Sequence, residues 1–413
     1  MKFIFDLDGT ITAKETLPII SKYFNVDKEI DKLTEETVKG NIPFIESFIN
    51  RVQILGDLPV SEINDLLSTI PLSESVYQFI QENKEDCVIA TGNFSGWIEK
   101  LVKRIGCKSY SSDGIVENNK IKKLTNILKK EDVVKKYKTQ GEQVIFIGEG
   151  NNDVEAMRES DISIACGLIH TPANSVLTIT DYAVYDENAL YRLLNQINSE
   201  QKGKSLILSC AGIGSRLGLG QTKALIDISG KPLIYWQLEQ FKEIEDIRIV
   251  VGFQANDIVK SVLQMRKDVI FVYNHNYFHT KTGASFYLGA RHGNEYSLAW
   301  DGDLLVHPDD IVSCINYPGE FIGCSKTITD DAVLASVNES GKVTSFSREN
   351  GDYEWSGPAC LKKEHVKYVS NHVYTQIEEH LPLPALVVRA QDIDTYDDYK
   401  NALEFIKTWG DGE

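Results

Sequence analysis

The sequence predicts an α/β protein built from two three-layer α/β/α domains. Its 413 residues suffice for two or three domains that each bury a core. Short apolar runs that suit buried parallel strands recur, and each is followed by polar residues or a glycine. The runs that carry the prediction are Lys2–Phe5, Cys87–Ala90, Gln143–Gly148 and Ser205–Cys210. A polar segment at 198–204 has the composition of a linker, so we expect domains at 1–200 and 204–413.

Composition narrows the class of protein. The chain has 42% hydrophobic and 25% charged residues, as in ordinary globular proteins. A net charge of −17 argues against nucleic-acid or anionic-membrane binding, although a locally positive site could still take an anionic substrate. No apolar stretch approaches the ~20 residues of a membrane span. The seven cysteines are scattered, and the chain opens directly on strand residues without a signal peptide. These features predict a cytoplasmic protein without membrane insertion; homo-oligomerisation is left open.

The first apolar run is followed by two carboxylates one residue apart, Asp6 and Asp8, and then by a glycine. The carboxyl ends of strands are where open α/β sheets place their ligands. Adjacent carboxylates repel each other, so the pair implies Mg²⁺ or a shared proton. One carboxylate could attack a phosphoryl group while the other handles the proton of the leaving group. A solvated turn would use the same residue types.

Three later segments supply complementary groups. They offer a hydroxyl and a glycine that can cradle phosphate, a lysine that can neutralise its charge, and further carboxylates for a cation. The candidates are Thr91, Gly92, Asn93, Lys130, Glu149, Asn152 and Asp153. Lys129 could take the place of Lys130.

The order and spacing of these four segments resemble the motifs of the haloacid dehalogenase superfamily of phosphatases, over roughly residues 1–195. The resemblance implies that Asp6 is the nucleophile, forming an aspartyl-phosphate, and that Asp8 is the general acid/base. It further implies that Thr91 and Lys130 bind phosphate; Lys130 is preferred because its context matches the phosphoserine phosphatases. The implied Mg²⁺ ligands are Asp6, Asp8, Glu149 and Asp153. The superfamily usually has Asp in place of Glu149, which leaves the metal geometry and the level of activity open.

The stretch between the first two motifs, about 75 residues, is too long for a simple crossover and predicts a helical cap at about 14–80. Within it, Arg51 shares one predicted helix face with apolar residues. A guanidinium there needs an anionic partner such as a substrate carboxylate, although an internal salt bridge or a solvated side-chain end would also serve. Glu15 and Arg51 fall where phosphoserine phosphatases hold the ammonium and carboxylate of their substrate, so the resemblance implies substrate contacts for both.

The second half restarts with the run Ser205–Cys210, followed by four glycines within nine residues. Backbone N–H groups of such a loop can wrap a polyphosphate, although a flexible loop is the simpler interpretation. Arg216 would add positive charge, and Lys223, directly after the loop, can reach an α-phosphate. The spacing is not that of the dinucleotide-binding fingerprint. The candidate nucleotide-binding residues here are Ala211, Gly212, Gly214, Ser215, Arg216 and Lys223.

This arrangement resembles the sugar-phosphate and phosphocholine nucleotidyltransferases across about residues 204–413. The resemblance implies that Asp303 and Asp394 hold Mg²⁺ at the α-phosphate under attack, with Asp301 or Asp392 as alternatives. Both halves are therefore expected to be Rossmann-like.

Three further segments resemble the phosphocholine cytidylyltransferases and imply contacts to the pyrimidine and ribose of CTP. Their candidate residues are Gly252, Asn274 and Ser285. Five aromatic residues could form a cation–π cage for an ammonium headgroup, or could simply be core and surface cover. They are Tyr277, Phe278, Trp300, Tyr353 and Trp355.

These inferences combine into a bifunctional enzyme. Its C-terminal half would transfer a cytidylyl group from CTP to a small phosphate or phosphonate, and its N-terminal half would be a Mg²⁺-dependent phosphomonoesterase. The enzyme alternative is a sugar-1-phosphate nucleotidyltransferase that uses UTP or dTTP. The non-enzyme alternative makes the N-terminal half a degenerate regulatory module, because of Glu149.

Overall fold

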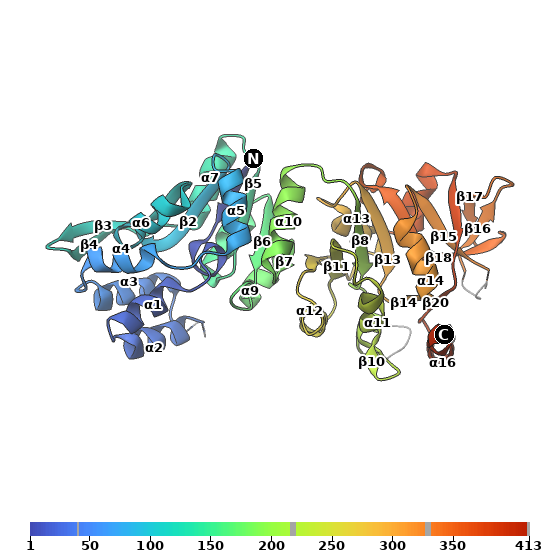
Figure 1. Cartoon of the computed structure of the whole chain (residues 1–413), viewed down its shortest axis with the longest axis horizontal. Helices are drawn as coiled ribbons and strands as arrows, with labels where there is room; N and C mark the ends of the chain where they lie inside the picture. Colours follow the sequence, from blue (N-terminus) through green and yellow to red (C-terminus); the bar gives the residue numbers. More distant parts are fainter. Residues whose placement is uncertain (39–40, 215–219, 327–331, 411–413) are drawn as a thin grey trace. The chain divides into compact units, whose positions relative to one another are not determined.

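The computed structural model describes residues 1–38, 41–214, 220–326 and 332–410. The chain divides into two compact units, Met1–Leu194 and Asn195–Glu413. Each unit is built on parallel strands with helical connections, so the predicted α/β fold is confirmed (Figure 1). Among the helices of the described ranges, none is long and apolar enough to cross a membrane.

The first unit contains a seven-stranded sheet in the order β7-β6-β5-β1-β2-β3-β4. All neighbouring strands are parallel except β3 and β4, which form an antiparallel hairpin. The strands are β1 (Lys2–Phe5), β2 (Cys87–Phe94), β3 (Lys108–Glu117), β4 (Lys120–Asn126), β5 (Val144–Gly148), β6 (Ile162–Cys166) and β7 (Tyr182–Val184). Strands β2, β5 and β6 are buried along their whole length, as their continuous apolar runs predict.

Within the described residues, five α-helices lie between β1 and β2, and five more follow along the chain as far as α10. The first five are α1 (Thr16–Tyr23), α2 (Asp27–Val38), α3 (Phe44–Leu55), α4 (Val60–Ser68) and α5 (Glu74–Glu82). The others are α6 (Ser95–Ile105), α7 (Lys130–Thr139), α8 (Val154–Glu159), α9 (Asn174–Leu177) and α10 (Glu187–Asn198), the last spanning the boundary between the units. The start of α4 is hydrogen-bonded to the β3–β4 hairpin, where Val60 N–H donates to Asn119 O over 2.8 Å.

Helix α6 shows why these segments become covering helices. Trp97, Ile98, Leu101 and Ile105 recur at helical spacing and are all buried. Gly106 ends the helix in the left-handed conformation, with a φ of +81°. On the face of β1 that carries Phe3, helix α5 supplies the ring of Phe79 at a centroid distance of 5.0 Å.

In the second unit, parallel strands run in the order β12-β11-β8-β13, and β18 lies antiparallel beside β13. From β18, the strands β15, β19, β17 and β16 continue and close back onto β18. The strands are β8 (Lys204–Ser209), β11 (Ile247–Val251), β12 (Ile270–Tyr273), β13 (Tyr296–Asp301), β15 (Phe321–Ser325), β16 (Leu334–Val337), β17 (Lys342–Ser347), β18 (Tyr353–Lys362) and β19 (Leu383–Val387).

The helices of this unit connect its strands, and two small sheets lie apart from the main one. The helices are α11 (Leu233–Gln240), α12 (Ala255–Val262), α13 (Thr282–Ala290), α14 (Pro308–Asn316), α15 (Tyr374–Ile377) and α16 (Tyr396–Lys407). The small sheets pair β9 (Asp227–Ile228) with β10 (Lys231–Pro232), and β14 (Leu304–Val306) with β20 (Ala390–Asp392). The second pairing matters for function, because it brings the segment around residue 394 beside the turn that follows β13.

Two candidate active sites

The candidate phosphatase residues meet at one edge of the first sheet. Asp6 and Asp8 follow β1, Thr91 lies in the C-terminal part of the neighbouring β2, and Glu149 follows β5 on the other side. Because these three strands are parallel and adjacent, their carboxyl ends share one edge. Lys130 is the first residue of α7 and is 3% exposed, whereas Lys129 is exposed to solvent. The structure therefore brings Lys130, not Lys129, to this edge.

Lys130 joins two of the carboxylates. Its Nζ lies 2.6 Å from Oδ1 of Asp6 and 2.6 Å from Oδ1 of Asp153. Burial opposes the charge of the lysine, but the carboxylates of Asp153 and Asp6 outweigh it and raise the pKa of Lys130. The other oxygen of Asp153 accepts the backbone N–H groups of Glu149 and Gly150, at 3.0 and 2.9 Å. This ion-paired cation lies where a phosphate bound beside Asp6 would need one.

Asp8 is held by neighbours from two other segments. Its Oδ1 accepts the backbone N–H of Thr16 at 2.8 Å, and its Oδ2 accepts the Asn93 amide at 2.6 Å. The same Asn93 amide donates to the Thr91 hydroxyl at 3.1 Å. The carbonyl of Gly92 accepts a hydrogen bond from the Ser112 hydroxyl at 2.9 Å. Sequence analysis did not single out Thr16, which no motif spacing distinguishes from other hydroxyl residues.

Glu15 and Arg51 lie at the same site, close to Glu149. Burial raises the pKa of Glu15 to about 8; the charges of Asp8 and Asp6 add to the rise, and a hydrogen bond to Glu149 and the charge of Arg51 oppose it. Arg51 is only 7% exposed. Burial lowers the pKa of its guanidinium, and the Glu15 and Asp8 charges raise it. The structure thus brings Arg51 to carboxylates of the site itself.

Two further residues lie near this site: His170, which was not predicted from the sequence, and Asn152, which was. His170 follows β6, and its Nε2 lies 3.7 Å from Oε1 of Glu15. Asn152 is half-buried, and its amide oxygen lies close over Gly150, where a Cβ would meet it at 2.5 Å.

Glu149 fits its position because residue 9 is glycine. A Cβ on Gly9 would lie 2.4 Å from Oε1 of Glu149, and Gly9 has a φ of +70°. The Oε2 atom of Glu149 is buried and makes no hydrogen bond within the described residues. Burial raises the pKa of Glu149 to about 9, with the charges of Glu15 and Asp6 adding to the rise.

The chemistry of these side chains suits a divalent cation. Burial raises the pKa of Asp6 to about 7, with the charge of Lys130 opposing the rise and those of Asp153 and Asp8 adding to it. Burial also raises the pKa of Asp8, against the hydrogen bonds from Thr16 and Asn93. A buried carboxylate oxygen without a hydrogen bond, as in Glu149, is a suitable Mg²⁺ ligand. In the parts of the chain that the structure describes, however, no three His, Cys, Asp or Glu side chains are already arranged to hold a metal. The Asp153 carboxylate instead pairs with Lys130 and accepts two backbone N–H groups. The four predicted Mg²⁺ ligands therefore remain a prediction.

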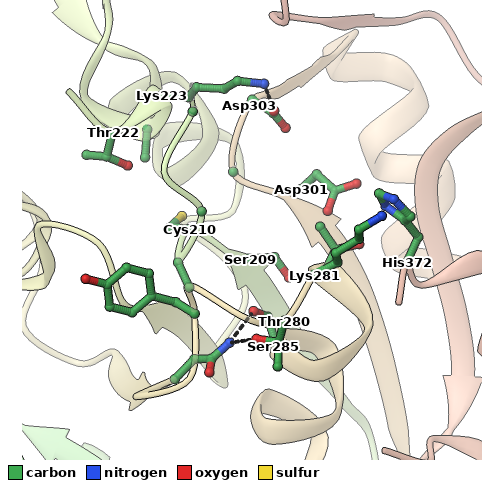
Figure 2. Close-up of a pocket in the computed structure, with 18 of the residues that line it drawn as sticks. Ser209, Cys210, Thr222, Lys223, Thr280, Lys281, Ser285, Asp301, Asp303 and His372 are labelled. Carbon is green, nitrogen blue, oxygen red and sulfur yellow. Dashed lines mark hydrogen bonds and ion pairs between the residues drawn. The ribbon is translucent and has the colours of Figure 1, made fainter. Parts of the chain in front are cut away.

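The second unit has a cavity of about 390 Å³ at the carboxyl ends of its parallel strands (Figure 2). Eight of the predicted residues line it, namely Ala211, Gly212, Gly214, Lys223, Asn274, Ser285, Asp303 and Asp394. Gly252 lies next to Tyr277, a residue of the cavity lining: a Cβ on Gly252 would lie 2.8 Å from the Tyr277 ring. The predictions for Ser215 and Arg216 fall outside the described residues.

Lys223 joins the two predicted metal carboxylates. Its Nζ lies 2.6 Å from Oδ2 of Asp303, and it also donates to Oδ1 of Asp394. Burial opposes this charge, but both carboxylates together raise the pKa of Lys223. The two aspartates are brought together by the pairing of β14 with β20, where Ile393 N–H donates to Asp303 O over 3.2 Å.

Of the two alternatives to these aspartates, only Asp301 lines the cavity; Asp392 is exposed. Burial raises the pKa of Asp301 to about 7, the charge of Asp303 adds to this, and Lys223 opposes it. Carboxylate oxygens are ligands that Mg²⁺ prefers, but the described residues contain no three such side chains already arranged to hold a metal, so Mg²⁺ at this cavity stays a prediction.

Asn274 and Ser285 are hydrogen-bonded to each other. The Asn274 amide donates to the Ser285 hydroxyl at 3.2 Å and to the Thr280 hydroxyl at 3.1 Å (Figure 2). Thr280 was not among the predicted residues. The proposed aromatic cage is not assembled within the described residues, since Tyr277 alone of its five members lines the cavity. Trp300 is instead a core residue, 1% exposed and packed on Phe241 at 4.9 Å.

Gln254, also missed from the sequence, holds the end of the glycine-rich loop. Its Oε1 accepts the backbone N–H of Thr222 at 2.8 Å, and its Nε2 donates to Gly220 O at 3.1 Å. Gln254 has a φ of +50°, a conformation that favours Asn or Gly. Only the contact shows its role, because a glutamine has no distinctive sequence signal.

We expect Gln254→Asn to raise the KM for the nucleotide about fivefold and to change kcat less. Asn tolerates the left-handed backbone, but it is one methylene shorter and loses at least one loop hydrogen bond, worth about 1 kcal/mol. Steady-state kinetics with each NTP in turn measure the effect. Gln264→Asn is the matched control, because Gln264 bonds the Tyr235 hydroxyl and not the loop. An unchanged KM in Gln254→Asn would contradict the positioning role.

Comparison with known proteins agrees with this division of the chain. Residues 3–161 match the haloacid dehalogenase-like hydrolases, and residues 205–318 match the MobA-like NTP transferase domain. The chain thus carries a haloacid dehalogenase-like hydrolase domain followed by a MobA-like NTP transferase domain, and both are families of enzymes. The two resemblances predicted from sequence are confirmed at this level.

Curated relatives match the N-terminal half. The phosphoserine phosphatase of Methanocaldococcus jannaschii is 26% identical over 175 residues, which are 39% of this chain and 83% of that protein. That of Archaeoglobus fulgidus is also 26% identical over 175 residues, and the chain spans about half of its length, 51%.

Solved structures resemble each half separately. The CTP:phosphocholine cytidylyltransferase of Streptococcus pneumoniae is 21% identical with a TM-score of 0.42, covering 49% of this chain and 99% of that chain. The inositol-1-phosphate CTP transferase of T. maritima is 17% identical with a TM-score of 0.45, covering 52% and 99%. A phosphoserine phosphatase is 21% identical with a TM-score of 0.39, covering 45% and 92%.

Proposed function

We propose that this protein is a bifunctional enzyme, a CTP-dependent cytidylyltransferase fused to a phosphomonoesterase. The observation that carries the proposal is the same in both units: a lysine bridges two carboxylates at the carboxyl ends of parallel strands. In the first unit Lys130 joins Asp6 and Asp153, and in the second Lys223 joins Asp303 and Asp394. Each arrangement supports the proposal, because a lysine at this position would offer positive charge to a reacting phosphoryl group.

In the first unit, a carboxylate oxygen of Asp6 would attack the phosphorus and form an aspartyl-phosphate as the alcohol leaves. Asp8, whose pKa is raised by burial, would give its proton to the leaving oxygen and then take one from the hydrolytic water. Lys130 and Thr91 would hold the phosphate oxygens. Mg²⁺, bound by the four predicted carboxylates, would neutralise phosphate charge.

The phosphatase substrate is proposed to be a small phosphorylated amino acid or a close analogue. Glu15 offers a carboxylate for an ammonium group, and the buried Arg51 offers a guanidinium for a carboxylate. Both belong to the same site as Asp8, whose charge acts on each of them. Gly92, Asn93 and Asn152 are the other proposed contacts, and Asn93 also fixes Asp8.

In the second unit, an oxygen of the acceptor phosphate or phosphonate would attack the α-phosphorus of CTP, and pyrophosphate would leave. The loop from Ala211 to Gly214 and Lys223 would hold the triphosphate, while Asn274 and Ser285 would contact the nucleoside. Mg²⁺ held by Asp303 and Asp394 would neutralise the departing pyrophosphate. The phosphatase must act on a different phosphate, because it would otherwise destroy the acceptor of the transferase.

Pyrophosphate release from ATP, GTP, CTP, UTP and dTTP, each tested with a panel of acceptors, examines the proposal. The panel contains choline phosphate, ethanolamine phosphate, aminoethylphosphonate, phosphoserine, glycerol phosphate and glucose 1-phosphate. We expect CTP to exceed the other nucleotides in kcat/KM by about tenfold or more. A preference for UTP or dTTP with glucose 1-phosphate would establish the sugar nucleotidyltransferase alternative instead.

A further inference from the structure

Three cationic or titratable basic side chains line the cavity of the second unit within the described residues: Lys223, Lys281 and His372. Lys223 is committed to Asp303 and Asp394. Lys281 makes no ion pair within the described part of the chain, although carboxylates line the same cavity. Nothing in the nucleotide site described above uses this charge.

The fold fixes the backbone of Lys281 at one wall of the cavity, while its side chain is exposed to solvent. Lys281 directly precedes α13, and its backbone N–H donates to Ser370 O at 2.9 Å. Gly283 N–H donates to Asn371 O at 2.9 Å. These bonds lock the segment that carries His372 against the start of α13. Figure 2 shows the side chains of Lys281 and His372 together on the same side of the pocket as Asp301, apart from Cys210 at the start of the glycine-rich loop.

The proposed reaction needs a positive side chain in this cavity that can bind the acceptor. Its acceptor brings a second phosphate or phosphonate dianion toward a triphosphate, in a cavity that already holds three carboxylates, Asp301, Asp303 and Asp394. Lys223 and the glycine-rich loop serve the triphosphate, so the acceptor requires a positive group of its own. The alternative recognition of an ammonium headgroup by an aromatic cage has no support, because Trp300 is core and Phe278 is 71% exposed.

We propose that Lys281 is the acceptor-binding residue of the transferase: its ammonium group holds the reacting phosphate or phosphonate beside Asp301. This inference rests on the proposed cytidylyl transfer. It adds the position of the acceptor, on the wall formed by the start of α13 and the segment of His372. It also assigns acceptor affinity, as distinct from nucleotide affinity, to one side chain.

The test is steady-state kinetics of Lys281→Met with CTP and the best acceptor of the panel. We expect the KM for the acceptor to rise tenfold or more and the KM for CTP to change less than twofold, with Lys281→Arg within about threefold of the wild type. Lys260→Met, on the exposed side of α12, is the matched control and should leave both KM values unchanged.

The outcomes separate the two proposals. An unchanged acceptor KM in an active Lys281→Met enzyme, or an equal rise in both KM values, would overturn the role of Lys281 and leave cytidylyl transfer standing. Absence of pyrophosphate release by the wild-type protein with every nucleotide and acceptor would overturn the proposed function and this inference with it. A selective rise in acceptor KM that Arg rescues would support both.

Discussion

Replacing Asp6 by Asn is expected to lower phosphatase turnover by about a thousandfold or more. Asn keeps the shape of the side chain and can still face Lys130, but a neutral amide oxygen cannot form the acyl phosphate. Asp6 is 7% exposed, and its carboxylate lies 2.6 Å from the Lys130 ammonium group. Release of phosphate from phosphoserine and from p-nitrophenyl phosphate, with Mg²⁺ present, measures the loss.

Two comparisons make this result specific. Asp57→Asn replaces an exposed aspartate of the same unit, paired with Lys120 at 3.2 Å, and should leave turnover unchanged. Cytidylyl transfer by Asp6→Asn should equal that of the wild type, which shows that the variant protein is intact. Equal phosphatase rates in the wild type and Asp6→Asn would exclude Asp6 as nucleophile. A wild type without phosphatase activity on any phosphomonoester would favour a regulatory role for the unit.

The residues that sequence reasoning placed well at this site are those that follow strands. Asp6, Glu149 and Asp153 could be predicted to meet because apolar runs mark β1 and β5, and parallel neighbours share one carboxyl edge. Lys130 could be chosen over Lys129 by resemblance alone, and the fold gives the physical reason: the first residue of α7 faces inward and its predecessor faces solvent. Strand periodicity by itself carries no such information about a helix start.

The contacts that the sequence could not predict depend on how separate elements pack against each other. Thr16 and His170 reach Asp8 and Glu15 through the packing of α1 and of the loop after β6. In the second unit, the bridge from Lys223 to Asp394 spans 171 residues and depends on the pairing of β14 with β20. Neither strand of that pair exceeds three residues, so no periodicity marks them. The prediction of an aromatic cage has no support in the structure, because Trp300 lies within β13 and belongs to the core.

Replacing Asp303 by Asn is expected to lower cytidylyl transfer by about a hundredfold to a thousandfold, without affecting phosphatase turnover. The variant removes one of the two carboxylates that Lys223 joins and one of the two proposed Mg²⁺ ligands. Lys223 would then pair with Asp394 alone, so its ammonium group would be held less firmly beside the α-phosphate. Asp394 alone would bind the metal less tightly than the two carboxylates together. Initial rates of pyrophosphate release at saturating CTP and acceptor measure the change in kcat.

The matched control for this variant is Asp397→Asn. Asp397 lies three residues after Asp394, but its side chain is 81% exposed and pairs with Lys400 on the surface of α16. It should retain the wild-type rate, because a surface ion pair contributes little to stability. A rate for Asp303→Asn within about threefold of the wild type would exclude Asp303 as a metal ligand and leave Asp301, which lines the same cavity, as the remaining partner for Asp394. Asp6→Asn and Asp303→Asn each alter one unit. If Asp6→Asn loses only phosphatase turnover and Asp303→Asn loses only cytidylyl transfer, the chain carries two independent phosphoryl-transfer sites.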